Sequence, residues 1–210
     1  MAYVVLIALA GAVALLDWWA VGTDRRQIEK WAKPAVMVVL IAAALLIPAD
    51  SEAIRWAIVA GLIFGLAGDV LLFFDRFIPG AAAFLVGHLA YVVALLMVPQ
   101  EPRGLLVGAV IILLVAVFVG RPIVAGAWAK SRTLGGIVAA YMLVIGIVVI
   151  LAIGSNSLVV EIAALLFLTS DALLAWARFV GSAPGGRVAV MVTYQLAQVG
   201  FVLAIPTLVP

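Results

Sequence analysis

The chain has 210 residues, of which 68% are hydrophobic and 10% are charged, and its mean hydropathy is +1.37. A water-soluble domain carries about 25% charged residues, so this composition excludes a soluble globule and indicates an integral membrane protein. The net charge of +2 gives no support to a nucleic-acid partner. The lack of cysteine and the single histidine, His88, exclude disulfides, thiol catalysis and Cys- or His-rich metal sites.

The apolar runs are nearly continuous and lack the period-two alternation of a barrel strand, which predicts an all-α membrane protein. A bilayer core of ~30 Å needs about 20 apolar residues per helix. We therefore expect one membrane domain, 1–210, built as a bundle of eight transmembrane helices. In chain order the predicted spans are 2–22, 34–48, 56–74, 80–98, 104–120, 134–153, 158–178 and 188–208.

Polar or turn-forming residues separate these spans, and the two longest breaks, 23–33 and 121–133, are predicted to be loops. The first span lacks a basic leader and a small-residue cleavage site, so we expect a retained helix and not a signal peptide. Ten of the twelve Lys and Arg residues lie in alternate loops, against Arg55 and Arg103 in the others. The positive-inside rule then predicts that both termini lie outside. We expect the protein to be integral to a bacterial cytoplasmic membrane.

Two segments of the chain are similar in sequence. Residues 66–77 and 168–179 are identical at six of twelve positions, including Asp69 with Asp171. The helix that follows the first segment also resembles the helix that follows the second. An offset of four helices gives both halves the same orientation, so we hypothesise two parallel four-helix repeats, 1–100 and 104–210, related by an axis along the membrane normal. Chance similarity between leucine- and alanine-rich helices is the alternative.

Several polar side chains fall at one depth. At about 1.5 Å per residue, Asp69 and Asp171 lie ~9–11 Å inside the cytoplasmic boundary, and His88, Tyr141 and Gln195 lie ~10–12 Å inside it. Ionisable residues at bilayer depth are functional candidates by default. We therefore expect the two aspartates to form the core of a site that opens toward the cytoplasmic leaflet. Tyr91 and Gln198 are expected one turn deeper on the faces that carry His88 and Gln195.

Each of these residues has a plainer interpretation. His88 and Gln195 could be interhelical hydrogen-bonding residues. Lys33, at the mouth of the second helix, could anchor the helix or reach an anionic head group. Asp17 is expected to be a solvated helix end. Glu161 is interpreted as a residue at the membrane interface. Gly61, Gly65 and Gly68 are interpreted as a seam of small residues at which a neighbouring helix packs beside Asp69.

Two buried carboxyls suit acid catalysis. Burial disfavours the ionised form and two nearby carboxylates repel, so at least one should be protonated near neutral pH. Such an acid could protonate an electron-rich bond in an amphiphile, while its partner guides water. The same pair could instead relay protons in a small transporter or serve a lipid-binding protein. Polarity concentrated on one side of the membrane favours the enzyme.

The motifs around these residues resemble the YhhN family, which includes the lysoplasmalogenases. The similarity runs from about residue 33 to 200. It rests on Gly68-Asp69 with Leu71-Leu72, on Phe84, Gly87-His88 and Tyr91, on Ser170-Asp171 with Leu173-Leu174-Ala175, and on Tyr194-Gln195 with Gln198.

The resemblance implies a cofactor-free and metal-free membrane hydrolase. It would cleave the vinyl-ether bond of lysoplasmalogen, giving a fatty aldehyde and glycerophosphoethanolamine or glycerophosphocholine. The catalytic residues carry over onto Asp69 and Asp171, whereas Asp17 inherits no role. We expect the head group beside Lys33, Arg76 or Arg178. The residues expected to bind or orient the lysophospholipid are Lys33, His88, Tyr91, Tyr141, Ser170, Tyr194, Gln195 and Gln198.

Overall fold

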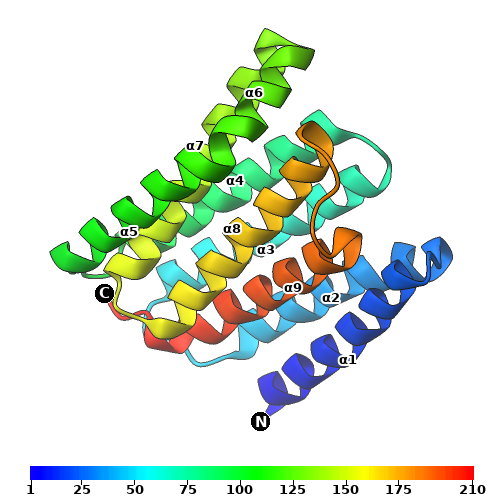
Figure 1. Ribbon diagram of the computed structural model, residues 1–210. Coiled ribbons are helices and arrows are strands. Elements are labelled where there is room, and N and C mark those ends of the chain that lie inside the picture. The colour runs from blue at the N-terminus through cyan, green and yellow to red at the C-terminus, as the bar shows by residue number, and fades with distance from the viewer.

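The computed structural model describes residues 1–210 and consists of helices and their connecting turns (Figure 1). The all-α class is confirmed. Helix α5 continues through a π-helical turn, Ala116–Gly120, directly into α6, so the chain makes eight helical rods. The elements are α1 (Ala2–Gly22), α2 (Arg26–Leu46), α3 (Glu52–Phe73), α4 (Phe77–Leu96), α5 (Pro102–Val115), α6 (Arg121–Lys130), α7 (Arg132–Gly154), α8 (Leu158–Phe179), α9 (Gly186–Ala204) and a 3₁₀ turn (Ile205–Thr207).

Seven of the rods are long and apolar enough to cross a bilayer. The chain is therefore an integral membrane protein. Helix α2 is the exception, because its first two turns are rich in charged side chains. They are Arg26, Glu29, Lys30 and Lys33.

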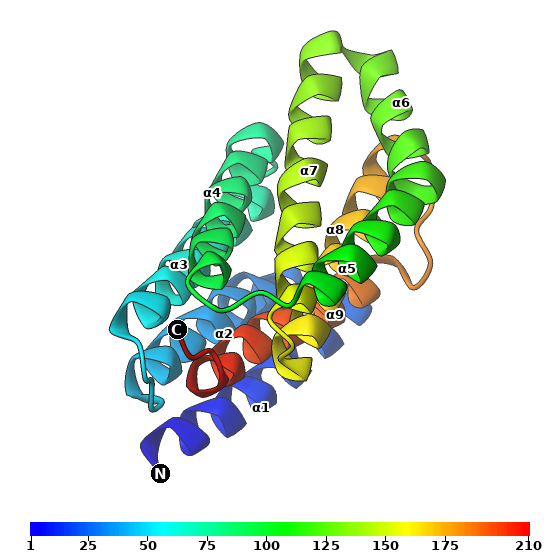
Figure 2. The ribbon, with the colours of Figure 1, turned by 90° about the vertical axis from the view of Figure 1, so that its left-hand side faces the viewer.

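The prediction of long loops at 23–33 and 121–133 was wrong, because most of these residues are helical. Helix α2 begins at Arg26, not at residue 34, and Pro34 lies within it. The polar residues 26–33 predict a loop, yet Glu29 and Lys33 are only 4% and 7% exposed. Likewise, residues 121–130 form α6, and Pro122 stands in its first turn, where a proline is tolerated. The rod from Pro102 to Lys130 is thus 29 residues long, and the chain turns back after it into α7, which packs beside α6 (Figure 2).

Consecutive helices pack as antiparallel hairpins, α1 with α2, α3 with α4 and α8 with α9. Helix α9 also contacts α1, α2 and α3, while α7 joins α4, α5 and α6 to α8. Three of the tight connections contain Asp24, Asp75 and Asn156 at positive φ, a conformation that Asp and Asn tolerate better than most residues. Asp24 and Asp75 stand in the turns of the α1–α2 and α3–α4 hairpins, and Asn156 stands in the α7–α8 turn.

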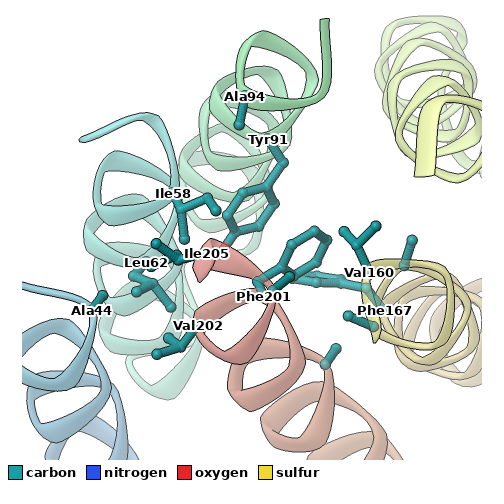
Figure 3. Close-up of a cluster of buried hydrophobic side chains, with 14 of the residues drawn as sticks. Ala44, Ile58, Leu62, Tyr91, Ala94, Val160, Phe167, Phe201, Val202 and Ile205 are labelled. Atoms are coloured by element: carbon teal, nitrogen blue, oxygen red, sulfur yellow. The ribbon is translucent and has the colours of Figure 1, made fainter. Parts of the chain in front are cut away.

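Large apolar side chains fill the half of the bundle that holds the α2–α3 and α4–α5 connections and the C-terminus (Figure 3). The rings of Tyr91 and Phe201 stack with their centroids 4.1 Å apart, and Phe167 meets Phe201 edge-on at 6.3 Å. Ile58 and Ile205 are buried beside them. These buried rings pack the centre of that half of the bundle.

Arg55, which we predicted to be a loop residue, is helical and only 9% exposed. Its guanidinium donates hydrogen bonds of 3.0, 3.0 and 2.7 Å to the carbonyls of Ala44, Leu45 and Ile47. These carbonyls belong to the end of α2, where backbone acceptors have no partner within the helix. Arg55 therefore serves as a C-terminal cap that α3 supplies to α2.

The predicted glycine seam on α3 is present. A Cβ atom on Gly61 would overlap the Tyr91 ring of α4, and one on Gly68 would lie 2.6 Å from the Phe84 ring. Between them, Gly65 faces the side chains of Tyr194 and Gln198 on α9. The seam thus lets two helices approach α3 immediately beside Asp69.

We predict that Gly61→Ala lowers thermal stability in detergent. The added methyl group must displace a fully buried tyrosine ring, and overpacking of this kind costs about 1–3 kcal/mol. Gly11→Ala on α1 is the matched control, because a Cβ there meets no atom within 4 Å. Equal melting temperatures for the two variants would show that the α3–α4 contact is looser than the structure indicates.

Candidate active site

Asp69 lies on α3 near the polar end of the bundle and is 1% exposed. The Lys33 Nζ atom of α2 lies 3.0 Å from its Oδ1 atom, and the Tyr194 hydroxyl of α9 donates a 2.8 Å hydrogen bond to its Oδ2 atom. Both carboxyl oxygens are therefore occupied. The prediction that Lys33 stands at the mouth of the second helix was wrong, because the earlier start of α2 carries it two turns into the bundle.

Asp171 lies on α8 and has different neighbours. The Tyr141 hydroxyl of α7 donates a 2.9 Å hydrogen bond to its Oδ2 atom, and the His88 Nε2 atom of α4 lies 3.4 Å from the same oxygen. The side chain of Asp171 is 13% exposed, against 1% for Asp69. No lysine or arginine pairs with Asp171, so the two aspartates sit in unlike electrostatic surroundings.

The hydrogen bond from His88 to the Phe84 carbonyl shows which ring nitrogen carries a hydrogen. Its Nδ1 atom is 2.7 Å from the Phe84 carbonyl, which can only accept, so Nδ1 carries a hydrogen. In neutral imidazole the Nε2 atom then presents a lone pair to Asp171. A lone pair facing a carboxylate oxygen at 3.4 Å is repulsive unless a proton lies between them. The His88–Asp171 pair is therefore a place where one proton can be held.

One cavity of about 370 Å³ brings the two aspartates together. It lies between α2, α3, α8 and α9 and opens beside the α8–α9 connection, from which Ser182 and Ala183 line it. The polar and charged side chains along its wall are Glu29, Lys33, Asp69, Ser170, Asp171, Ser182, Arg187 and Tyr194. Ser170 donates its hydroxyl to the Val190 carbonyl at 3.0 Å, which occupies that proton.

A second, apolar hollow of about 60 Å³ adjoins the first at Asp171. Sixteen of its seventeen lining residues are hydrophobic, and the seventeenth is Asp171. Leu72, Phe84 and Leu174 line both spaces, so they form the wall between them. Asp171 thus stands where a polar space meets an apolar one, which is the surrounding that an amphiphile requires.

Three predicted site residues lie away from both carboxyls. Gln195 turns toward α1 and donates a 2.7 Å hydrogen bond to Asp17. Tyr91 donates to the side-chain oxygen of Gln198 at 2.5 Å, deeper in the bundle. None of the three makes a hydrogen bond to Asp69 or Asp171. They connect helices beneath the cavity and do not line it.

Two charged residues have surroundings that the sequence did not reveal. Asp17, expected to be a solvated helix end, is fully buried because α1 packs against α2 and α9. Arg187, counted as a loop residue, stands on the first turn of α9. Its Nη2 atom lies 2.6 and 2.7 Å from the two carboxylate oxygens of Glu29. Hydropathy alone does not predict the contact of Asp17 with Gln195 or that of Arg187 with Glu29.

Arg76 and Arg178, which we expected beside the head group, do not line this cavity. Both line a separate surface hollow around Phe77, and the Arg178 guanidinium lies 4.9 Å from the centre of the Phe77 ring. Arg187 is instead the arginine of the cavity wall. The chain has no group of three or more His, Asp or Glu side chains close enough to hold a metal ion.

A model of the YhhN family matches residues 28–205, which include both aspartates, Lys33 and His88. The chain belongs to the YhhN family. No curated protein and no solved structure matches the chain. Helix α1 precedes the matched region, so Asp17 is a buried acidic group that the YhhN match does not cover.

We predict that Lys33→Met destabilises the protein by about 3–5 kcal/mol, because it leaves Asp69 buried without a cation. The double variant Lys33→Met/Asp69→Leu removes both charges and should recover most of that loss. Thermal unfolding in detergent compares four proteins: wild type, Lys33→Met, Asp69→Leu and the double variant. Additive destabilisation in the double variant would show that the two side chains do not form a coupled ion pair.

Proposed function

We propose that this YhhN protein is a membrane hydrolase that cleaves the vinyl-ether bond of lysoplasmalogen. The single observation that carries the proposal is the position of Asp171, between a polar cavity and an apolar hollow and beside an imidazole that can share its proton. A lysophospholipid has the same two-part character. Its head group would occupy the cavity, and its chain would enter the hollow.

In this proposal, Asp171 is the general acid. The carbon of a vinyl ether that accepts the proton is the one nearer the alkyl chain, and a chain lying in the apolar hollow would bring that carbon toward Asp171. Proton transfer to it leaves a positive oxocarbenium at the carbon bonded to oxygen. Asp171 would give up the proton whose hydrogen bond His88 Nε2 can accept, and the Tyr141 hydroxyl would stabilise the carboxylate formed.

Asp69 would guide the water, since its ion pair with Lys33 favours the carboxylate form. Water attacks the oxocarbenium carbon and gives one proton to Asp69, which forms a hemiacetal. Asp69 then returns that proton to the glycerol oxygen as the carbon–oxygen bond breaks. The hemiacetal hydroxyl gives its proton to Asp171, so the aldehyde leaves, one water is consumed and both carboxyls regain their starting states.

The finer topology is also a proposal. We propose eight spans, with α2 among them, because two of the charges that lower its hydropathy, Glu29 and Lys33, are paired inside the bundle. The distribution of Lys and Arg supports a site open to the cytoplasmic leaflet, with both termini outside. The bacterial cytoplasmic membrane as its location is part of the same proposal. The repeat hypothesis gains support from the contacts, since Asp69 takes partners from α2 and α9 and Asp171 takes them from α7 and α4.

A proton-coupled transporter using the same aspartates is the competing proposal. Alternating access needs a polar route toward both faces of the membrane. The stacked rings of Tyr91 and Phe201, with Phe167 beside them, instead fill the other half of the bundle. This one-sided arrangement favours hydrolysis over transport.

We predict that purified protein releases fatty aldehyde from lysoplasmalogen and that Asp69→Asn and Asp171→Asn each lower the rate at least ~100-fold, as expected for loss of acid–base catalysis. Asp75→Asn, in the exposed α3–α4 turn, is the matched control and should keep the wild-type rate. A lysophospholipid with a saturated ether gives no aldehyde in this mechanism. Absence of release by well-folded wild type with ethanolamine and choline head groups would refute hydrolysis and favour transport or lipid binding.

The placement of the chain gives a separate prediction. Ala81 lines the apolar hollow, so Ala81→Leu should shorten the space and raise KM for long alkenyl chains about tenfold relative to short ones. Ala82→Leu is the matched control, because Ala82 is exposed on the same helix. KM measured over a series of chain lengths tests the idea. An unchanged chain-length profile in Ala81→Leu would exclude this hollow as the chain site.

A further inference from the structure

The cations that line the polar cavity are already neutralised by carboxylates. Lys33 pairs with Asp69 at 3.0 Å, and Arg187 pairs with Glu29 at 2.6 Å. The Arg187 side chain is 51% exposed, whereas the Glu29 side chain is 6% exposed. The outer of the two pairs thus joins a buried negative charge to a positive charge that water and ligands can reach.

We propose that the Glu29–Arg187 pair recognises the zwitterionic head group of a lysophospholipid. The inference rests on the proposed function, because it assumes that such a lipid occupies the cavity. Arg187 uses its Nη2 atom on Glu29, and its remaining contact is a 3.5 Å approach of Nη1 to exposed Asp24. Its other N–H groups are suited to phosphate oxygens. The phosphate displaces Glu29 from Arg187, and the ammonium of the head group takes the place of Arg187 at Glu29.

In this exchange every buried charge keeps a partner of opposite charge. That requirement makes the cavity selective among head groups. A zwitterion replaces one ion pair by two, so Glu29 keeps a cation. An anionic head group takes Arg187 and offers no cation in return, which leaves Glu29 buried and unpaired. Discrimination by stranding a buried charge is a common source of specificity. The cavity should therefore select phosphoethanolamine and phosphocholine over phosphoglycerol.

A purely structural latch between α2 and α9 is the competing explanation. Both residues also line the cavity that contains Asp69 and Asp171, a position that a latch does not need. Glu29 in addition borders another hollow, of about 180 Å³, between α2 and α3. These features favour recognition.

The test measures binding of saturated lyso-ether lipids, which cannot be hydrolysed, to the purified full chain in detergent. The three probes carry phosphoethanolamine, phosphocholine or phosphoglycerol. We expect wild type to bind the two zwitterionic lipids about tenfold more tightly than phosphoglycerol. Glu29→Gln should bind phosphoglycerol about tenfold more tightly than wild type does and lose the preference. A gain of affinity cannot come from misfolding, and an unchanged preference in Glu29→Gln overturns the proposal.

Two further variants separate recognition from latching. Arg187→Gln should weaken binding of all three lipids, while Arg26→Gln, an exposed arginine of α2 outside the cavity, should weaken none. The charge swap Glu29→Arg/Arg187→Glu can rebuild a latch but exchanges the positions of the two charges. Recovery of both the melting temperature and the wild-type lipid preference by the swap would establish a latch and overturn recognition.

Failure of this inference is distinguishable from failure of the proposed function, because the probes are not hydrolysed. The expected lipid preference without aldehyde release from lysoplasmalogen would refute hydrolysis and leave head-group recognition standing. Aldehyde release together with equal binding of the three lipids would support the hydrolase and refute the role of the Glu29–Arg187 pair.

Discussion

A polar group at bilayer depth must find its partner inside the protein, because lipid tails offer neither hydrogen bonds nor counter-charges. This constraint governs how the helices are arranged. Asp69 binds α3 to α2 through Lys33 and to α9 through Tyr194. Asp171 joins α8 to α7 through the Tyr141 hydroxyl. The same contacts therefore hold the bundle together and define the site, so the fold and the candidate chemistry cannot be altered independently.

Close approach of the backbones makes these pairings possible. Gly68 lets the Phe84 ring lie against α3 next to Asp69. The Phe84 carbonyl, one turn before His88, then holds the imidazole so that its Nε2 atom faces Asp171. The ring of Phe84 also forms part of the wall between the polar cavity and the apolar hollow. A glycine on one helix thus influences the proton position on another, through a single aromatic residue.

The sequence predicted the fold class and the number of helical rods, because both follow from hydropathy and helix length. It mispredicted the start of α2 and missed α6, since charged or proline-containing stretches are read as loops when their partners are unknown. For the same reason Asp17 and Arg187 were misplaced: each acquires its surroundings from a residue far away in sequence, Gln195 and Glu29 respectively. Depth can be read from a single helix, whereas pairing requires the arrangement of all of them.

The two aspartates show how one framework can give two carboxyls different roles. The internal repeat remains a prediction, but it accounts for both carboxyls sitting at one end of the bundle and taking partners from corresponding helices. Their partners differ in charge, since Asp69 meets an ammonium and Asp171 meets an imidazole. A cation favours a carboxylate, while an imidazole lone pair favours a shared proton. Environments that push two carboxyls toward opposite protonation states provide one base and one acid, which is what the proposed cleavage requires.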